Sequence, residues 1–331
     1  MDCLRRRLGL ALALLAFVVV PLNADDEYPT LSISNESLTV NLYLPDSEQG
    51  YYRGPRFDWS GVIKSVEMRG HKFYGPLHAD HDPEIHDSIG GPAEEFAMNN
   101  PMGFAEAKAG EPFVKIGVGL LKKGKEQQYR FDAQYQLMQP GVWQVTHGKD
   151  WVEFEQQLDG GRGWAYDYKK RIEILEGQSS FVINHWLKNA GSKFIDINHY
   201  NHNFTRIDDT PYGIDYTVEF PFSTYKNNNI NDIAKYHDNI LEVVKPLHDR
   251  ALWLNVYAKP GPSEFNAGLI RNNKTGAAVR FKGDAPISKY VFWAVERAAC
   301  PEPFISIQLM PDEIKEWAIS YEFTVDGQSD E

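Results

Sequence analysis

The stretch FIDINHYNHNF, residues 194–204, decides the fold. Apolar and polar residues alternate through its first half, which is the period-two pattern of a half-buried β-strand. Successive side chains of a strand point to opposite faces. His199, Asn201 and Asn203 therefore share one face with Ile195, and this face is predicted to point toward the core.

The opposite face of the predicted strand is polar and aromatic. It carries Asp196, Asn198, Tyr200 and His202. On this interpretation His202 lies in a polar cleft with Tyr200 beside it, and His199 lies nearer the core or a bend. A β-bulge in this Asn-rich run would exchange the two faces. His199 therefore stays beside His202 as a candidate for the cleft.

Strand-like segments of the same kind follow one another along the chain. They include VKIGVGLL, WVEFEQQL, WAYDYKKRIEIL, SFVINHWLKN, ALWLNVYA, YVFWAVE, FISIQL and WAISYEFTV, separated by Gly-, Pro- and Asn-rich turns. Helix signals are few: the best covers residues 230–244, and a short turn is expected at 311–315. So many strands without alternating helices predict an all-β fold, a large antiparallel sandwich or barrel in one domain.

The N-terminus has the layout of a secretory signal peptide. Three arginines precede an apolar run over residues 8–20, and a polar, acidic segment follows. The apolar run is too short for a comfortable membrane span. We expect cleavage after Ala24, a secreted or periplasmic location and a single mature domain over residues 25–331. A retained N-terminal anchor is the alternative.

Composition limits the partners of the mature chain. The full chain has a net charge of −12, and loss of Asp2 and three arginines with the first 24 residues brings it near −14. Such an acidic chain argues against nucleic acid and anionic membranes as partners. Cys300 is then the only cysteine, so no internal disulfide is expected. The 18 Phe, 8 Trp and 17 Tyr fit a β-rich core, and exposed rings could hold sugars.

Two further clusters contain possible functional groups. In GGPAEEF, Glu94 and Glu95 point opposite ways if the chain is extended, so one could face a cleft; solvated turn carboxylates are the alternative. LHADHDPEIHD, residues 77–87, holds three histidines among acidic residues, which are metal-ligand types. Its spacing matches no strict ligand template, so a metal site here is an alternative and not the prediction.

Near the C-terminus, Pro311-Asp312-Glu313 separates two strand patterns. Glu313 lies in this turn. Its carboxylate either projects over a sheet face or is an ordinary hairpin acid.

Three segments together resemble the galactose mutarotase-like (aldose 1-epimerase) superfamily: RFDWSGVIKSVEMRGHKFYG, NHYNHNF and PDEIKEW with the later YEF. Mutarotases typically read N-H-x-Y-F-N-L at mid-chain, which places His199 at the histidine, with Asn201 and His202 at the aromatic pair. They typically read P-G-E-x-Y near the end, which places Glu313 at the glutamate and Asp312 at the glycine. The resemblance spans most of residues 30–325.

The resemblance implies an antiparallel β-supersandwich with few short helices and a sugar cleft on its concave face. It implies cofactor-free acid–base interconversion of sugar anomers, with Glu313 as the base and His202 or His199 as the acid. The expected ligand is a mono- or oligosaccharide. The candidate substrate contacts are Glu94, Glu95, Tyr200, Asn201, Asn203, Trp143 and Trp164. The alternatives are a non-catalytic carbohydrate-binding protein, or a polysaccharide lyase or glycosidase on the same scaffold.

Overall fold

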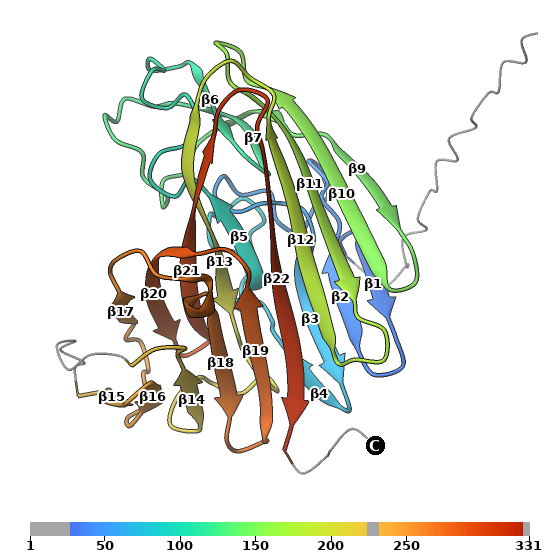
Figure 1. The fold of residues 1–331 in the computed structure, drawn as a ribbon, viewed down its shortest axis with the longest axis vertical. Coiled ribbons are helices and arrows are strands. Elements are labelled where there is room, and N and C mark those ends of the chain that lie inside the picture. The colour runs from blue at the N-terminus through green and yellow to red at the C-terminus, as the bar shows by residue number, and fades with distance from the viewer. Residues whose placement is uncertain (1–26, 224–231, 327–331) are drawn as a thin grey trace, which may run out of the picture.

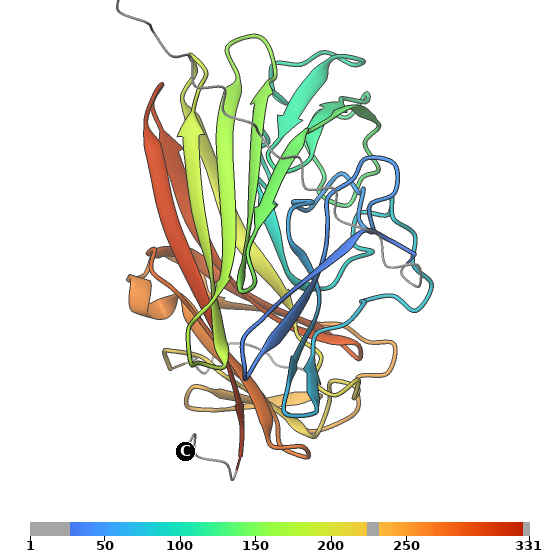
Figure 2. The same cartoon turned by 90° about the vertical axis from the view of Figure 1, so that its right-hand side faces the viewer.

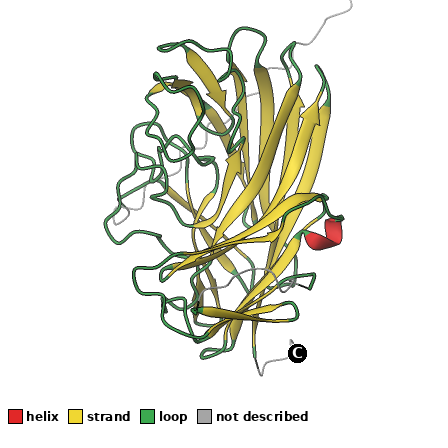
Figure 3. Cartoon of the chain, turned by 90° about the vertical axis from the view of Figure 1, so that its left-hand side faces the viewer, coloured by secondary structure: helices red, strands yellow, loops and turns green. Residues whose placement is uncertain are grey.

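Antiparallel strands form nearly all of the regular secondary structure, and long loops connect them (Figure 3). A computed structural model describes residues 27–223 and 232–326. Within these residues the only helix is the 3-10 turn Ser263–Phe265. No helix in this part of the chain has the length and hydropathy needed to cross a membrane. The predicted all-β class is confirmed.

The strands form four sheets (Figure 1). The ten-stranded sheet has the order β15-β16-β14-β18-β19-β22-β12-β11-β10-β9, and the five-stranded sheet has the order β17-β20-β21-β13-β5. The strands of the ten-stranded sheet are β9 (Trp143–His147), β10 (Trp151–Asp159), β11 (Ala165–Ile174), β12 (Ser180–Asn189), β14 (Tyr216–Glu219), β15 (Ala234–His237), β16 (Ile240–Val243), β18 (Ala267–Asn272), β19 (Ala277–Gly283) and β22 (Ile314–Val325). Those of the five-stranded sheet are β5 (Gly91–Phe96), β13 (Ile195–Phe204), β17 (Leu252–Tyr257), β20 (Ile287–Val295) and β21 (Ala298–Leu309).

Two smaller sheets complete the fold (Figure 2). One contains β1 (Thr30–Ser34), β2 (Thr39–Tyr43), β3 (Val62–Met68) and β4 (His71–Phe73); the other contains β6 (Pro112–Lys115), β7 (Gly119–Lys122) and β8 (Leu137–Pro140). The long loops that flank these strands lie over one face of the five-stranded sheet, because they supply residues that line a cavity there.

Alternation along the long strands places the core between the two large sheets. In β12, Phe181, Ile183 and Leu187 are buried, whereas Asn184 between them is exposed. The buried face of such a strand removes apolar surface from water, and the polar face stays solvated. The core side of the ten-stranded sheet packs on β13, as the edge-on contact of Trp317 with His199 shows, with ring centroids 5.0 Å apart.

One glycine fixes where β5 begins. Gly91 has φ +69, a conformation that favours glycine, and a Cβ atom there would lie 2.7 Å from the carbonyl oxygen of Ile63. A side chain at this position would push β5 away from β3. The glycine therefore sets the position of the strand that carries Glu94 and Glu95.

The predicted helix over residues 230–244 was wrong for the residues described. Ala234–His237 and Ile240–Val243 form a hairpin instead, and residues 230 and 231 lie outside the described part. Asp238 turns the chain at φ 53, a conformation that Asp tolerates better than most residues. The pairing of Leu241 with Val218 of β14 buries both side chains, which overrides the local helix pattern.

Candidate functional site

The histidine strand β13 lies between β21 and β5. Tyr200 is opposite Phe304 of β21 on one side and Glu95 of β5 on the other. Both pairings run without a shift, and the bridge between Thr205 and Ala299 continues the same register. No bulge interrupts the strand, so the alternation predicted from the sequence is confirmed. His199 and His202 lie on opposite faces of the five-stranded sheet.

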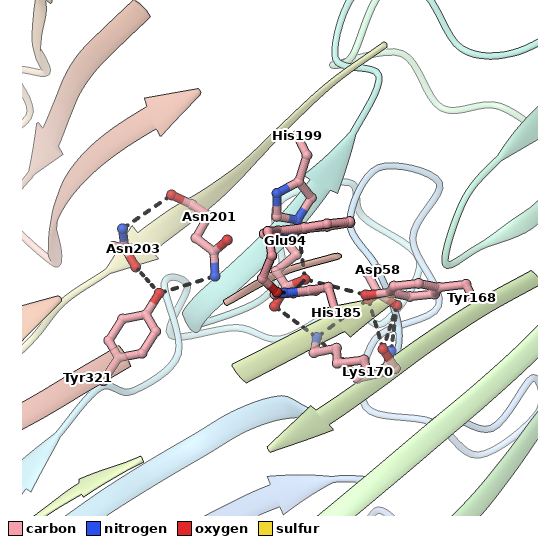
Figure 4. Close-up of polar contacts among 11 residues, drawn as sticks. Asp58, Glu94, Tyr168, Lys170, His185, His199, Asn201, Asn203 and Tyr321 are labelled. Atoms are coloured by element: carbon pink, nitrogen blue, oxygen red, sulfur yellow. Dashed lines mark hydrogen bonds and ion pairs between the residues drawn. The ribbon is translucent and has the colours of Figure 1, made fainter. Parts of the chain in front are cut away.

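The face toward the ten-stranded sheet holds a buried polar cluster around Glu94 (Figure 4). Oε2 of Glu94 lies 2.8 Å from Nε2 of His185 and 3.3 Å from Nε2 of His199. Oε1 lies 3.2 Å from Nζ of Lys170, which also lies 3.4 Å from Asp58. All five side chains are buried. Buried charges are tolerated when they are paired, so the cluster works as one unit.

The carboxylate of Glu94 and the neighbouring imidazole of His199 differ in charge state. Burial alone would raise the pKa of Glu94, but its interactions with His185 and Lys170 hold the pKa well below the ordinary value. Burial lowers the pKa of His199 to about 4. Glu94 is therefore an anion and His199 a neutral imidazole near pH 7.

This cluster offers metal-ligand types but already contains a cation. Glu94, His185 and His199 present one ligand atom each, and these atoms lie within 4.8 Å of one another. The ammonium of Lys170, however, pairs with the same carboxylate at 3.2 Å and supplies positive charge there. The arrangement fits a buried ion-pair cluster better than a metal centre.

On the other face of the sheet, Glu95 holds an arginine in place. Its Oε2 accepts hydrogen bonds from Nε of Arg56 at 2.8 Å and from the Tyr200 hydroxyl at 2.6 Å. Its Oε1 accepts one from Nζ of Lys115 at 2.9 Å. The guanidinium of Arg56 also lies over the ring of Phe131, 4.4 Å from its centroid. These contacts fix the guanidinium at the wall of a cavity.

This cavity has a volume of about 190 Å³ and lies on the face of His202. Its polar lining residues are Arg56, His86, Asp87, His202 and Glu302, and its aromatic ones are Phe131, Phe204, Trp253 and Trp293. They come from three loops and four strands: the loop before β3, the loop between β4 and β5, the loop between β7 and β8, and strands β13, β17, β20 and β21. A small pocket with a few convergent polar groups is the usual form of a ligand site.

Within the cavity, His202 and Glu302 face each other across neighbouring strands. Nε2 of His202 lies 3.2 Å from Oε1 of Glu302. Among the described residues, neither Nδ1 of His202 nor Oε1 of Glu302 has a hydrogen-bond partner with good geometry. Buried polar atoms are normally satisfied, so a bound ligand is one way to complete this pair.

Burial shifts both groups toward their neutral forms. It raises the pKa of Glu302 to about 8. It lowers the pKa of His202 well below the ordinary value, and the charge of Arg56 lowers it further. The cavity therefore contains a protonated carboxyl and an unprotonated imidazole near pH 7. Such a pair can donate one proton and accept another without a cofactor.

The structure does not bring Glu313 to either histidine, so the predicted meeting of these groups across one cleft is corrected. Ile195 pairs with Leu309, and Glu313 lies beyond that end of β13, whereas His202 lies seven residues the other way. At about 3.4 Å per residue, the distance along the strand from Ile195 to His202 is roughly 24 Å. Glu313 is exposed, and its Oε2 accepts the Met310 N–H at 2.7 Å within the turn.

Other predicted substrate contacts lie outside the cavity. Asn201 donates to the Tyr321 hydroxyl at 3.1 Å, and Asn203 accepts from that hydroxyl at 2.8 Å, both between the sheets (Figure 4). Trp143 packs on the core near Tyr168. Four more predicted residues do not line the cavity: Glu94, Glu95, Tyr200 and Trp164. The first three form the buried contacts described above, and Trp164 lines a separate surface hollow. Only His202 of the predicted set lines the cavity.

The histidine-rich segment 77–87 divides between a packing role and the cavity. His81 stacks on Tyr51 at 3.8 Å and contacts the Ser88 hydroxyl at 2.9 Å. His86 and Asp87 line the cavity. Asp87 also lies 3.2 Å from Nε2 of His78.

Sequence reasoning missed Glu302 and Arg56. A signal for Glu302 was present in CPEPF, where one carboxylate stands in a strand between apolar residues and prolines. Arg56 stands similarly beside aromatic residues in RFDW. A charged residue inside an apolar stretch is either paired or functional, but its partners come from distant segments.

Comparison with solved structures defines the class of fold. The Slr1438 protein of Synechocystis sp. PCC 6803 aligns over 91% of this chain and 97% of its own, with a TM-score of 0.58 and 11% identity. A galactose mutarotase-like protein of Clostridium acetobutylicum aligns over 89% and 95%, with a TM-score of 0.54 and 10% identity. A proposed aldose 1-epimerase of Escherichia coli K12 aligns over 89% and 99%, with a TM-score of 0.53 and 12% identity.

The chain therefore has the galactose mutarotase-like fold, as its sequence motifs predicted. Neither the family models nor the curated protein sequences give a match. At 10–12% identity the likeness to these structures concerns the fold. A shared fold does not fix the chemistry of the site, which depends on the residues that line it.

Proposed function

We propose that this protein is an aldose 1-epimerase-like isomerase, which interconverts the anomers of a sugar bound in the cavity of His202 and Glu302. The observation that carries the proposal is the 3.2 Å approach of these two side chains in a cavity of about 190 Å³. Drug-sized ligands usually occupy roughly 300–1,000 Å³. The cavity therefore suits one sugar ring.

Ring opening needs one base and one acid close together. The anomeric hydroxyl and the ring oxygen are bonded to the same carbon, C1, so the groups that serve them have to be neighbours. His202 takes the proton of the anomeric hydroxyl, and Glu302 gives its proton to the ring oxygen. The bond from C1 to the ring oxygen breaks, and C1 becomes an aldehyde carbon. Rotation about C1–C2 and the reverse transfers close the other anomer.

The proton states support this assignment of roles. Glu302, whose pKa is raised to about 8, holds the proton that it donates. His202 is neutral and can accept one. This division reverses the expectation that a glutamate is the base. It requires a protonated Glu302, so the reaction rate is expected to fall above about pH 8.

Arg56 and His86 are placed to orient the sugar. Arg56 is held by Glu95 and Tyr200, so its guanidinium keeps one position at the cavity wall. His86 lines the same cavity. Fixed donors reduce the entropy lost when hydroxyl groups are bound in one orientation. We propose these two residues as substrate contacts.

Glycoside hydrolysis is the second candidate, because two carboxyl groups, Asp87 and Glu302, line one cavity. Glycosidases use such a pair, one as acid and one as base or nucleophile. Asp87 already pairs with His78 at 3.2 Å, which favours the isomerase.

One experiment separates these activities. The purified protein is added to freshly dissolved aldohexoses and aldopentoses, and anomer exchange is followed by NMR; in parallel it is incubated with a panel of polysaccharides, and new reducing ends and unsaturated products are measured. Faster exchange of at least one aldose without polymer cleavage supports the isomerase. Polymer cleavage without anomer exchange contradicts it, and so does binding of sugars without either reaction.

A further inference from the structure

Two tryptophans stand next to the reactive pair. Trp253 of β17 and Trp293 of β20 are direct partners in the strand register, and both line the cavity with His202 and Glu302. Trp293 meets the His202 ring edge-on, with centroids 5.4 Å apart. Trp293 therefore belongs to the inner wall, and Trp253 lies one strand further out, on the edge strand of the sheet.

Packing in the core does not explain why β17 carries a tryptophan at position 253. Leu252, Leu254 and Val256 of β17 point into the core, whereas Trp253 is 63% exposed. It is the only one of the eight tryptophans, all of which lie in the described residues, that is largely exposed. Edge strands usually carry charged residues on such a face, which discourages pairing with other chains. A large exposed apolar side chain beside a pocket instead indicates a surface that binds something.

The size of the cavity indicates which kind of ligand binds beside Trp253. About 190 Å³ is enough for one sugar ring, and the two tryptophans extend the wall outward from it. An indole presents a flat apolar face that suits the flat C–H face of a pyranose.

We infer that the natural substrate is the reducing end of an oligosaccharide: the reactive ring occupies the cavity, and the next sugar of the chain stacks on Trp253. This inference rests on the proposed isomerase activity and specifies its substrate class. It makes Trp253 a specificity-determining residue outside the acid–base chemistry.

The test compares each aldose with a disaccharide that ends in it: glucose with cellobiose and maltose, xylose with xylobiose, and mannose with mannobiose. Anomer exchange by the wild type is expected to have a higher kcat/KM for at least one disaccharide than for its aldose. Trp253→Ala is expected to lower this disaccharide-to-aldose ratio by about tenfold, mainly through KM, and Trp253→Phe to restore most of it. Trp186→Ala, which removes a ring from the ten-stranded sheet, is the matched control and leaves the ratio unchanged.

Several results would overturn the inference. The wild type could show no preference for any disaccharide, or the ratio could stay the same in Trp253→Ala. Conversion of a dimer to a monomer in Trp253→Ala without a change in the ratio would assign the ring to a contact between copies of the chain. If the wild type accelerates exchange of no sugar, the proposed function fails. In that case, binding of the same disaccharides is measured by titration of the tryptophan fluorescence. Binding that is lost in Trp253→Ala supports the stacking site, and absence of binding to the wild type refutes it.

Discussion

Glu94 and Glu95 are consecutive residues of β5, yet their carboxylates lie on opposite faces of the five-stranded sheet. Glu94 pairs with Lys170 and His185 between the two large sheets, and Glu95 pairs with Arg56 beside the cavity. Alternation along one strand thus separates a structural cluster from a candidate catalytic one. Substitutions on the two faces are therefore expected to differ in effect: those near Glu94 change stability, and those in the cavity change activity.

Glu94→Gln is expected to destabilise the fold by about 3–5 kcal/mol, because removing one charge of a buried pair leaves the ammonium of Lys170 without full compensation. Urea unfolding at pH 7 measures the loss. Glu316→Gln, on the exposed face of β22, is the control and should change stability by less than about 0.5 kcal/mol. Equal stability of Glu94→Gln and the wild type would contradict the role of this cluster.

Stability should also fall as the pH falls from 6.5 to 4. The pKa of His199 is lowered from 6.5 to about 4, so in this range the unfolded chain binds a proton that the folded chain does not. Above pH 6.5 this group therefore does not change the free energy of unfolding, and below it the free energy of unfolding decreases by roughly 3 kcal/mol toward pH 4. Urea unfolding at several pH values should show a shallower decline for His199→Gln. The same slope for both proteins would show that His199 is not the responsible group.

Glu302→Gln should make the protein more stable while it removes activity. The pKa of Glu302 is raised from 4.5 to about 8, so the unfolded chain releases this proton more readily, and the glutamate costs stability as the pH rises from 4.5 to 8. Glutamine does not titrate. The variant is expected to gain roughly 2–3 kcal/mol at pH 7 and less than about 1 kcal/mol at pH 5. Urea unfolding at both pH values checks this, and a destabilised variant at pH 7 would speak against a buried, neutral carboxyl.

Glu313→Gln should leave anomer exchange within about twofold of the wild type, because Glu313 lies in an exposed turn far along the strand from His202. Its cost is expected to be only about 0.5–1 kcal/mol of stability, from a weaker hydrogen bond to Met310. Exchange rates of Glu313→Gln and Glu302→Gln, measured side by side, check the assignment. Loss of exchange in the first variant and not in the second would return the role to Glu313.

The sequence alone predicted the all-β class and the two faces of β13. Both follow from local alternation, which needs no knowledge of distant segments. The choice of His202 for the polar cleft came from the same rule, and the structure places this side chain in the cavity.

The partner of His202 could not be predicted in that way. Glu302 approaches His202 because β13 pairs with β21 in one particular register, and a sequence pattern does not give the register between strands about a hundred residues apart. The motif overlay chose Glu313 instead. Arg56 enters the cavity from a loop, whose path depends on the packing of the whole domain.

The most direct test of the acid–base assignment is the rate of anomer exchange in two histidine variants, measured by NMR at pH 7 on the best aldose or disaccharide of the wild type. His202→Asn is expected to lower kcat by about 10²–10⁴-fold, since it removes the base. His199→Asn, assayed well below its unfolding temperature, is expected to stay within a few-fold of the wild type. Loss of exchange in His199→Asn with normal rates in His202→Asn would contradict the account.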